Sequence, residues 1–314
     1  MRYLFGGKGG VGKTTISAAY AAHRATTART LLVSTDTSPS LSDIFEREIG
    51  AEETRVEENL FAIEINAAVA MERYKKELRA RIEALNMDFD FDVKTYLEAM
   101  TLSPGAQEAA VFDEFSAHLL REDFDCLVFD TAPAGETLRL LAMSSLIQRW
   151  MGIIVRTRRE VVRLKEVLTG RFKDPLLQQL AEMKDKFDRV KRILHAPTTH
   201  LIFVLNPEKL PIEETHRAIA NLQRFKFHVE GVVVNRSVST NAPISNGLQA
   251  TQARYLQRIR EEFGNRILAE APVWHDEPRG LQQLRAMGEI LSTLDHASAG
   301  RTRKGFLRHK FDKI

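Results

Sequence analysis

The sequence has 314 residues, of which 44% are hydrophobic and 28% charged, with 45 Lys and Arg against 42 Asp and Glu. This balance is typical of a folded globular protein and excludes a disordered chain. The single cysteine forms no disulfide within the chain, and alone it builds no zinc or iron–sulfur site. No apolar run approaches the ~20 residues of a membrane-spanning helix, and the apolar start is too short for a signal peptide. We therefore expect a soluble, cytoplasmic protein.

Short β-branched or apolar segments along the chain predict buried strands, and helical patterns separate them. This alternation predicts an α/β fold, a mostly parallel sheet with helices on both faces. We expect a single domain over residues 1–299, followed by a basic tail at 300–314. The expected strands are 3–5, 30–35, 60–65, 126–129, 201–205, 231–234 and 266–269.

The first expected strand leads into a glycine-rich loop that matches the phosphate-binding pattern G-x-x-x-x-G-K-[ST]. Glycines let backbone N–H groups converge on phosphate oxygens, and the helix expected at 15–23 adds the partial positive charge of its N-terminus. We expect Lys13 to reach the β- and γ-phosphates and the Thr14 hydroxyl to ligate Mg²⁺. The loop therefore predicts an ATP–Mg²⁺ site. Its expected nucleotide-binding residues are Gly7, Gly9, Gly10, Val11, Gly12, Lys13, Thr14 and Thr15.

A second lysine, Lys8, stands at the front of this loop. With it, residues 7–15 resemble the deviant phosphate loop of one class of P-loop NTPases. That class includes the partition ATPases, nitrogenase iron protein, the arsenite-pump ATPase and the tail-anchored-protein targeting ATPase. The resemblance implies a homodimer in which Lys8 reaches the partner's nucleotide, so that Lys8 joins Lys13 as a candidate catalytic residue.

Residues 34–45, after the second expected strand, resemble switch I of the arsenite-pump and tail-anchored-targeting ATPases. Asp36 and the Leu-Ser-Asp-x-Phe end match that pattern, whereas Thr-Ser-Pro at 37–39 replaces its Pro-Ala-His. The resemblance implies that Asp36 orients the attacking water. An aspartate at the carboxyl end of a strand, facing a phosphate loop, suits this role. Asp43 fits a helix N-cap at least as well as a catalytic role.

Four apolar or aromatic residues that end in Asp130 predict a Walker-B strand, with Asp130 holding Mg²⁺ through water. The continuation to residue 139 resembles switch II of the same family, with Glu136 where histidine is frequent. Gly135 lets the backbone approach or leave the γ-phosphate.

Later segments extend the resemblance to about residue 290. Asn235 follows the strand at 231–234, where the family has an asparagine that contacts adenine. Pro272 opens the loop where the family closes over the base, and Pro-Arg-Gly at 278–280 resembles that loop's end. The resemblance therefore adds Asn235 and Pro272 to the nucleotide-binding residues.

Two helical insertions are expected, at about 66–115 and 143–195. Apolar residues recur at helical spacing in both, which predicts amphipathic helices. Either these residues pack against one another and the sheet, or some of them face outward as an apolar groove for a partner. In the first insertion the residues are Met71, Tyr74, Leu78, Ile82 and Leu85. In the second they are Leu146, Ile147, Trp150, Met151, Ile154 and Val155, followed by Leu176, Leu180, Met183, Phe187, Val190 and Leu194.

The members of this family share their nucleotide chemistry and differ in the ligand or client that they bind. The metalloid site of the arsenite-pump ATPase needs several thiolates, whereas Cys126 lies alone in an apolar strand, as a structural cysteine does. The resemblance thus implies a homodimeric targeting ATPase that couples its nucleotide state to a hydrophobic transmembrane client and works with a membrane receptor, and no nucleic acid is expected. Two alternatives stay open. One is an arsenite- or anion-pump-driving ATPase subunit, and the other is a nucleotide-dependent switch that binds a membrane or protein surface through the basic tail.

Overall fold

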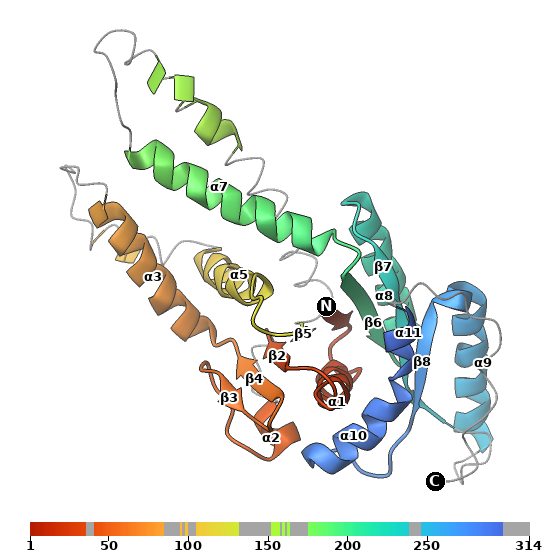
Figure 1. Ribbon diagram of the computed structural model, residues 1–314. Coiled ribbons are helices and arrows are strands. Elements are labelled where there is room, and N and C mark those ends of the chain that lie inside the picture. Colours follow the sequence, from red (N-terminus) through yellow and green to blue (C-terminus); the bar gives the residue numbers. More distant parts are fainter. Residues whose placement is uncertain are drawn as a thin grey trace.

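The computed structural model describes residues 1–35, 41–84, 95, 98–99, 105–131, 152–157, 159–160, 162–163, 175–238 and 246–297. Its centre is an eight-stranded sheet of order β3-β4-β2-β5-β1-β6-β7-β8 (Figure 1). The strands are β1 (Arg2–Gly7), β2 (Thr30–Ser34), β3 (Thr54–Arg55), β4 (Leu60–Glu64), β5 (Cys126–Asp130), β6 (Thr199–Leu205), β7 (Val229–Ser237) and β8 (Ile267–Pro272).

Neighbouring strands are parallel throughout the sheet except for the β3–β4 pair. Parallel pairing needs crossover connections, and helices supply them between successive strands. The predicted α/β class with a mostly parallel sheet is confirmed, and each expected strand is present. β3 was not expected, because its two residues pair antiparallel at the sheet edge and carry no apolar run.

Helices cover both faces of the sheet, and the alternation of side chains along each strand separates two cores. On β5, Leu127 and Phe129 belong to one core, whereas Cys126 and Val128 belong to the other. The first core is covered by α3 (Ala67–Ala84), α5 (Ala106–Leu119), α7 (Pro175–Leu194), α8 (Lys209–Arg224) and α9 (Asn246–Phe263). The second is covered by α1 (Lys13–Arg24), α2 (Leu41–Phe45), α10 (Gly280–Ile290) and α11 (Thr293–Ala297).

Three helices, α3, α5 and α7, form a layer that extends past the sheet and is called the helical arm below (Figure 1). Lys186 on α7 pairs with Asp113 on α5 at 2.7 Å. Gln179 on α7 donates a hydrogen bond to the carbonyl oxygen of Arg81 on α3 at 2.7 Å. These contacts tie the arm together along its length.

The arm contains parts of both expected insertions, and much of their apolar stripe packs inward. Phe187, Val190 and Leu194 are buried, and Met71 and Tyr74 pack against the core from partly buried positions. Packing on the sheet is therefore confirmed for these residues. The aromatic residues at 85–94 and most of 132–174 lie outside the described residues. Among the helices in the described parts of the chain, none is long and apolar enough to cross a membrane.

Candidate nucleotide-binding site

The phosphate loop connects the central strand β1 to α1. Gly10 and Gly12 have left-handed φ angles of 82° and 86°, which side chains other than glycine rarely adopt. Gly12 is also the N-cap of α1, and a Cβ placed on it would lie 2.4 Å from Nδ2 of Asn235. The loop therefore needs glycine at position 12 for two independent reasons, its backbone angle and its contact.

Lys13 and Lys8 occupy different positions in this loop. Lys13 is 5% exposed, and its Nζ donates a hydrogen bond to the carbonyl oxygen of Lys8 at 3.3 Å. The amine thus lies against the loop, where a phosphate oxygen would meet it. Lys8 is half-buried and is not among the residues that line the cavity in front of the loop.

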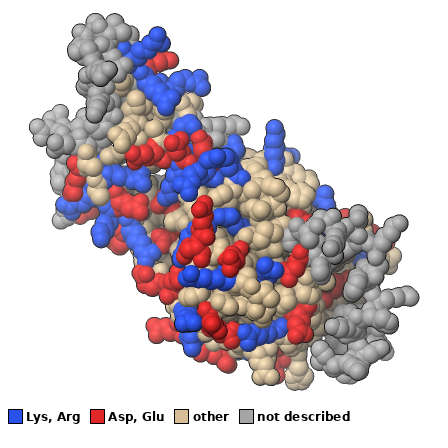
Figure 2. All heavy atoms as spheres, in the orientation of Figure 1, with Lys and Arg blue, Asp and Glu red and all other residues tan. Residues whose placement is uncertain are grey.

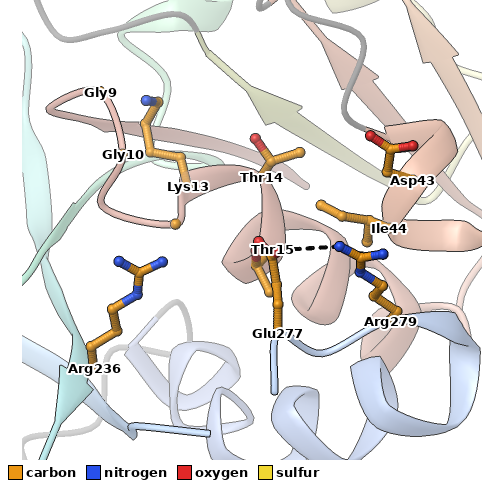
Figure 3. A pocket seen from close by; sticks show the side chains of 11 residues that line it. Gly9, Gly10, Lys13, Thr14, Thr15, Asp43, Ile44, Arg236, Glu277 and Arg279 are labelled. Carbon is orange, nitrogen blue, oxygen red and sulfur yellow. Dashed lines mark ion pairs between the residues drawn. The ribbon is translucent and has the colours of Figure 1, made fainter. Parts of the chain in front are cut away.

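That cavity has a volume of about 270 Å³ and draws on four segments far apart in the sequence (Figure 3). The loop and α1 meet the start of α2, the end of β7 and the turn before α10. Arg236 and Arg279 bring two cations to its wall, which suits a polyanionic ligand. The lining residues are Gly9, Gly10, Gly12, Lys13, Thr14, Thr15, Asp43, Ile44, Arg236, Glu277 and Arg279.

Three of these lining residues, Arg236, Ile44 and Glu277, were not expected. Arg236 follows Asn235 at the carboxyl end of β7, and its φ of 55° is left-handed. Its position directly after an expected site asparagine is the signal that could have found it. Glu277 pairs with Arg279 at 3.6 Å within the turn before α10, as the dashed line in Figure 3 marks.

Asp43 lies in the first turn of α2, which begins at Leu41. The N-cap interpretation of Asp43 is therefore wrong, because the residue is inside the helix. Its carboxylate belongs to the cavity wall (Figure 3).

Asp130 is fully buried at the carboxyl end of β5. Register places it between Phe5 of β1 and Ser34 of β2, so it stands next to the strand that carries the phosphate loop. The Ser34 hydroxyl donates a hydrogen bond to Oδ2 of Asp130 at 3.3 Å. A buried carboxylate and the Thr14 hydroxyl are hard oxygen donors of the kind that Mg²⁺ takes beside substrate phosphates. Their role as ligands stays a prediction.

Asn235 supports the loop from behind. It is 4% exposed, and its Nδ2 donates a hydrogen bond to the carbonyl oxygen of Val11 at 2.9 Å. Pro272 ends β8 beside Ser237 and does not line the cavity. Contacts of Asn235 and Pro272 with a base stay predictions.

Two expected segments fall outside the described residues. They are 36–40, which includes Asp36 and the departure at 37–39, and 132–150, which includes Gly135 and Glu136.

Cys126 is buried in β5, and burial raises the pKa of its thiol to about 11 despite the nearby Arg24. A thiol in this state is protonated at neutral pH and is a poor metalloid ligand. Within the described ranges, no three His, Cys, Asp or Glu side chains are grouped so as to hold a metal ion.

Comparison with known proteins shows the family of this chain. A family model described as anion-transporting ATPase matches residues 1–293. "Putative arsenical pump-driving ATPase 2" of Aquifex aeolicus is 30% identical, over 92% of this chain and 98% of that protein. "ATPase ASNA1 homolog 1" of Paramecium tetraurelia is 30% identical, over 93% and 92% respectively, and "ATPase GET3" of Lodderomyces elongisporus is 29% identical, over 93% and 90%. The chain therefore belongs to the anion-transporting ATPase family, and it is an ATPase with an α/β fold consistent with a P-loop NTPase.

Proposed function

We propose that this ATPase acts in the cytoplasm as a homodimer that couples ATP hydrolysis to binding a hydrophobic transmembrane segment of a client protein. The observation that carries the proposal is a pair of exposed isoleucines, Ile153 and Ile154, which are 62% and 40% exposed. They belong to a helical segment, 152–157, which lies above α7 in Figure 1. Adjacent large apolar side chains at the surface favour a partner that covers them.

The face of the helical arm is largely charged. Lys, Arg, Asp and Glu side chains intermix over it in Figure 2. Lys75 pairs with Glu72 at 2.7 Å, and Arg79 pairs with Glu83 at 2.8 Å. Charged pairs of this kind offer an apolar client little to bind on α3.

Hydrolysis would proceed in the cavity with the roles that the resemblance implies. Mg²⁺, held by Thr14 and through water by Asp130, would supply charge to the phosphates. Lys13 and the loop N–H groups would stabilise the charge that develops on them, and Asp36 would orient the water. Lys8 lies outside its own chain's cavity, which agrees with a reach toward the nucleotide of a second copy. A membrane receptor would accept the client afterwards.

The proposal is favoured over an arsenite-pump subunit by the chemistry of the thiol. The sequence holds one cysteine, and its pKa of about 11 keeps it protonated at neutral pH. A metalloid site built from several thiolates therefore has no counterpart in one chain. The pump-driving role belongs to the Aquifex relative by name.

The test is capture of a synthetic transmembrane peptide by the purified protein with ADP or with a non-hydrolysable ATP analogue. We expect dimers by light scattering and capture that changes several-fold between the two nucleotides. The paired substitution Ile153→Asp and Ile154→Asp should abolish capture and leave peptide-free ATP turnover unchanged. Leu210→Asp, at an apolar residue 59% exposed on α8, is the matched control and should retain capture.

Capture that ignores the nucleotide, or that survives the paired substitution, would contradict the proposal. Stimulation of turnover by arsenite without any peptide capture would instead support the pump-driving alternative.

A further inference from the structure

Glu64 is a buried carboxylate at the carboxyl end of β4, outside the residues assigned above to nucleotide or metal. It is 8% exposed. Its Oε1 accepts a hydrogen bond from the backbone N–H of Leu41 at 2.6 Å. Leu41 is the first residue of α2 and follows directly on 36–40, which contain Asp36. Glu64 therefore holds the chain at Leu41, within the segment 34–45 that resembles switch I.

The same side chain belongs to a row of polar residues along the carboxyl edge of the sheet. Register pairs Glu64 with Ser34 and Ser34 with Asp130. In-register residues on parallel strands point to the same side of a sheet, and the Ser34 hydroxyl donates to Asp130 at 3.3 Å. The row thus runs from the expected magnesium ligand to the anchor of Leu41.

Along the chain, Glu64 is followed after two residues by α3, the first helix of the helical arm. The N–H of Ile65 donates to the carbonyl oxygen of Ser34 at 2.8 Å. Oδ1 of Asn66 then accepts hydrogen bonds from the N–H groups of Ala68 and Val69, at 2.9 and 3.2 Å, and so caps α3. Only Ile65 and Asn66 separate Glu64 from α3, and both have fixed hydrogen-bond partners. A displacement of Leu41 that moves Glu64 should therefore also move the start of α3.

We propose that Glu64 is a positioning residue. It holds Leu41, in the segment that resembles switch I, in a fixed place relative to Asp130, and it transmits movement of Leu41 to α3. This deepens the proposed function and rests on it for the purpose of the coupling. The effect of Glu64 on ATP turnover needs no client.

The experiment compares three variants. Glu64→Ala removes the acceptor, whereas Glu64→Gln keeps a side-chain oxygen that can accept the same hydrogen bond. Glu270→Ala is the matched control, because it removes a partly buried carboxylate of the edge strand β8 that pairs with Arg260 at 3.3 Å. The measurements are kcat and KM for ATP, affinity for a fluorescent ADP analogue, and hydrogen exchange of α3 with ADP and with a non-hydrolysable ATP analogue.

We expect Glu64→Ala to lower kcat by about 10- to 100-fold, the scale of a displaced reacting group, with KM and ADP affinity within about twofold of the parent. The nucleotide-dependent difference in α3 exchange should disappear. Glu64→Gln should restore both properties, and Glu270→Ala should behave as the parent. Glu64→Asp, which shortens the side chain by one methylene, replaces the alanine variant if that variant does not fold, and kcat should fall there too.

An unchanged kcat in Glu64→Ala would overturn the inference. So would a loss that glutamine does not restore, a rise in KM that accounts for the whole loss, or a parent protein whose α3 exchange ignores the nucleotide. Failure of the parent to capture a peptide, with the Glu64 results as expected, would instead remove the client and leave the positioning role in place.

Discussion

Gly12 illustrates how much of the site depends on single residues. Its φ of 86° and the 2.4 Å that would separate a Cβ from Nδ2 of Asn235 leave no room for a side chain. We expect Gly12→Ala to weaken ATP binding by about 10- to 100-fold, because a left-handed alanine costs about 1–2 kcal/mol and the clash displaces Asn235 from Val11. Isothermal titration calorimetry with ATP measures this.

Gly50→Ala is the control for this substitution. A Cβ at Gly50 meets nothing within 4 Å, and its φ is not left-handed. ATP affinity should stay at the parent value there. Equal affinities for Gly12→Ala and the parent would show that nucleotide does not approach this part of the loop.

Some residues of the site could be predicted from the sequence, whereas others are placed only by the tertiary fold. The phosphate loop could be predicted because its conformation is local and eight consecutive residues carry the pattern. Asp130 was expected from its place at the end of a strand. Arg236 was missed although it directly follows an expected site residue, Asn235, near the end of β7. Ile44 and Glu277 were not expected, because they reach the cavity through the placement of α2 and the path of the turn before α10, which no local pattern in the sequence records.

α10 packs closely against α1, the helix that follows the phosphate loop, at Gly288. A Cβ on Gly288 would lie 2.5 Å from the carbonyl oxygen of Ala19 and 2.7 Å from Cβ of His23. Alanine is the better helix former, yet we expect Gly288→Ala to lower the free energy of unfolding by about 1–3 kcal/mol, because α10 must move away from α1. Urea unfolding followed by circular dichroism measures the change.

Gly152→Ala is the paired control, since Gly152 is also helical and a Cβ there meets nothing within 4 Å. It should be neutral, or stabilising by up to about 1 kcal/mol. A stable Gly288→Ala variant would mean that α10 and α1 pack less closely than the structure has them.

The hydrophobic pattern of the sequence predicted the buried strands of the sheet but did not predict the short edge strand β3. β5 and β6 are apolar runs that are buried on both faces, so their pattern is unambiguous. β3 has two residues and no such run. In the helical arm, spacing predicted α3 and α7 but could not separate buried Phe187 from half-buried Leu78, because that depends on where the neighbouring helix ends.

One ionic cluster joins α11, near the end of the described chain, to the helix that follows the phosphate loop. Asp295 on α11 accepts a hydrogen bond from the Tyr20 hydroxyl at 2.8 Å and pairs with Arg24 at 3.0 Å and His23 at 3.2 Å. Burial acts to raise the pKa of Asp295, but the hydrogen bonds from His23 and Tyr20 and the charge of Arg24 outweigh it, so that the pKa is lowered. The folded state therefore favours the carboxylate.

Because the pKa is lower in the folded protein, this carboxylate stabilises the fold above its unfolded pKa of about 4, and the effect is lost as the pH falls through the folded value. We expect Asp295→Asn to lower the free energy of unfolding by about 1–2 kcal/mol at pH 7, with the difference from the parent shrinking below about pH 4. Urea unfolding between pH 3 and 8 tests this. Asp276→Asn, at a side chain 91% exposed, should follow the parent at every pH. A difference for Asp295→Asn that stays constant with pH would refute the linkage.

Because β1 lies between β5 and β6 in the sheet, it is synthesised before both of the strands with which it pairs. Residues 2–5 pair with 127–130 and residues 2–7 pair with 199–204, so the strand that carries the phosphate loop is made before both of its partners, and β6 is made much later. At bacterial or eukaryotic elongation rates that interval is roughly 10–40 s, during which β1 and its apolar side chains have no completed sheet to join. The phosphate loop is therefore translated long before the second strand that flanks β1, and the nascent chain must avoid aggregation until β6 has left the ribosome.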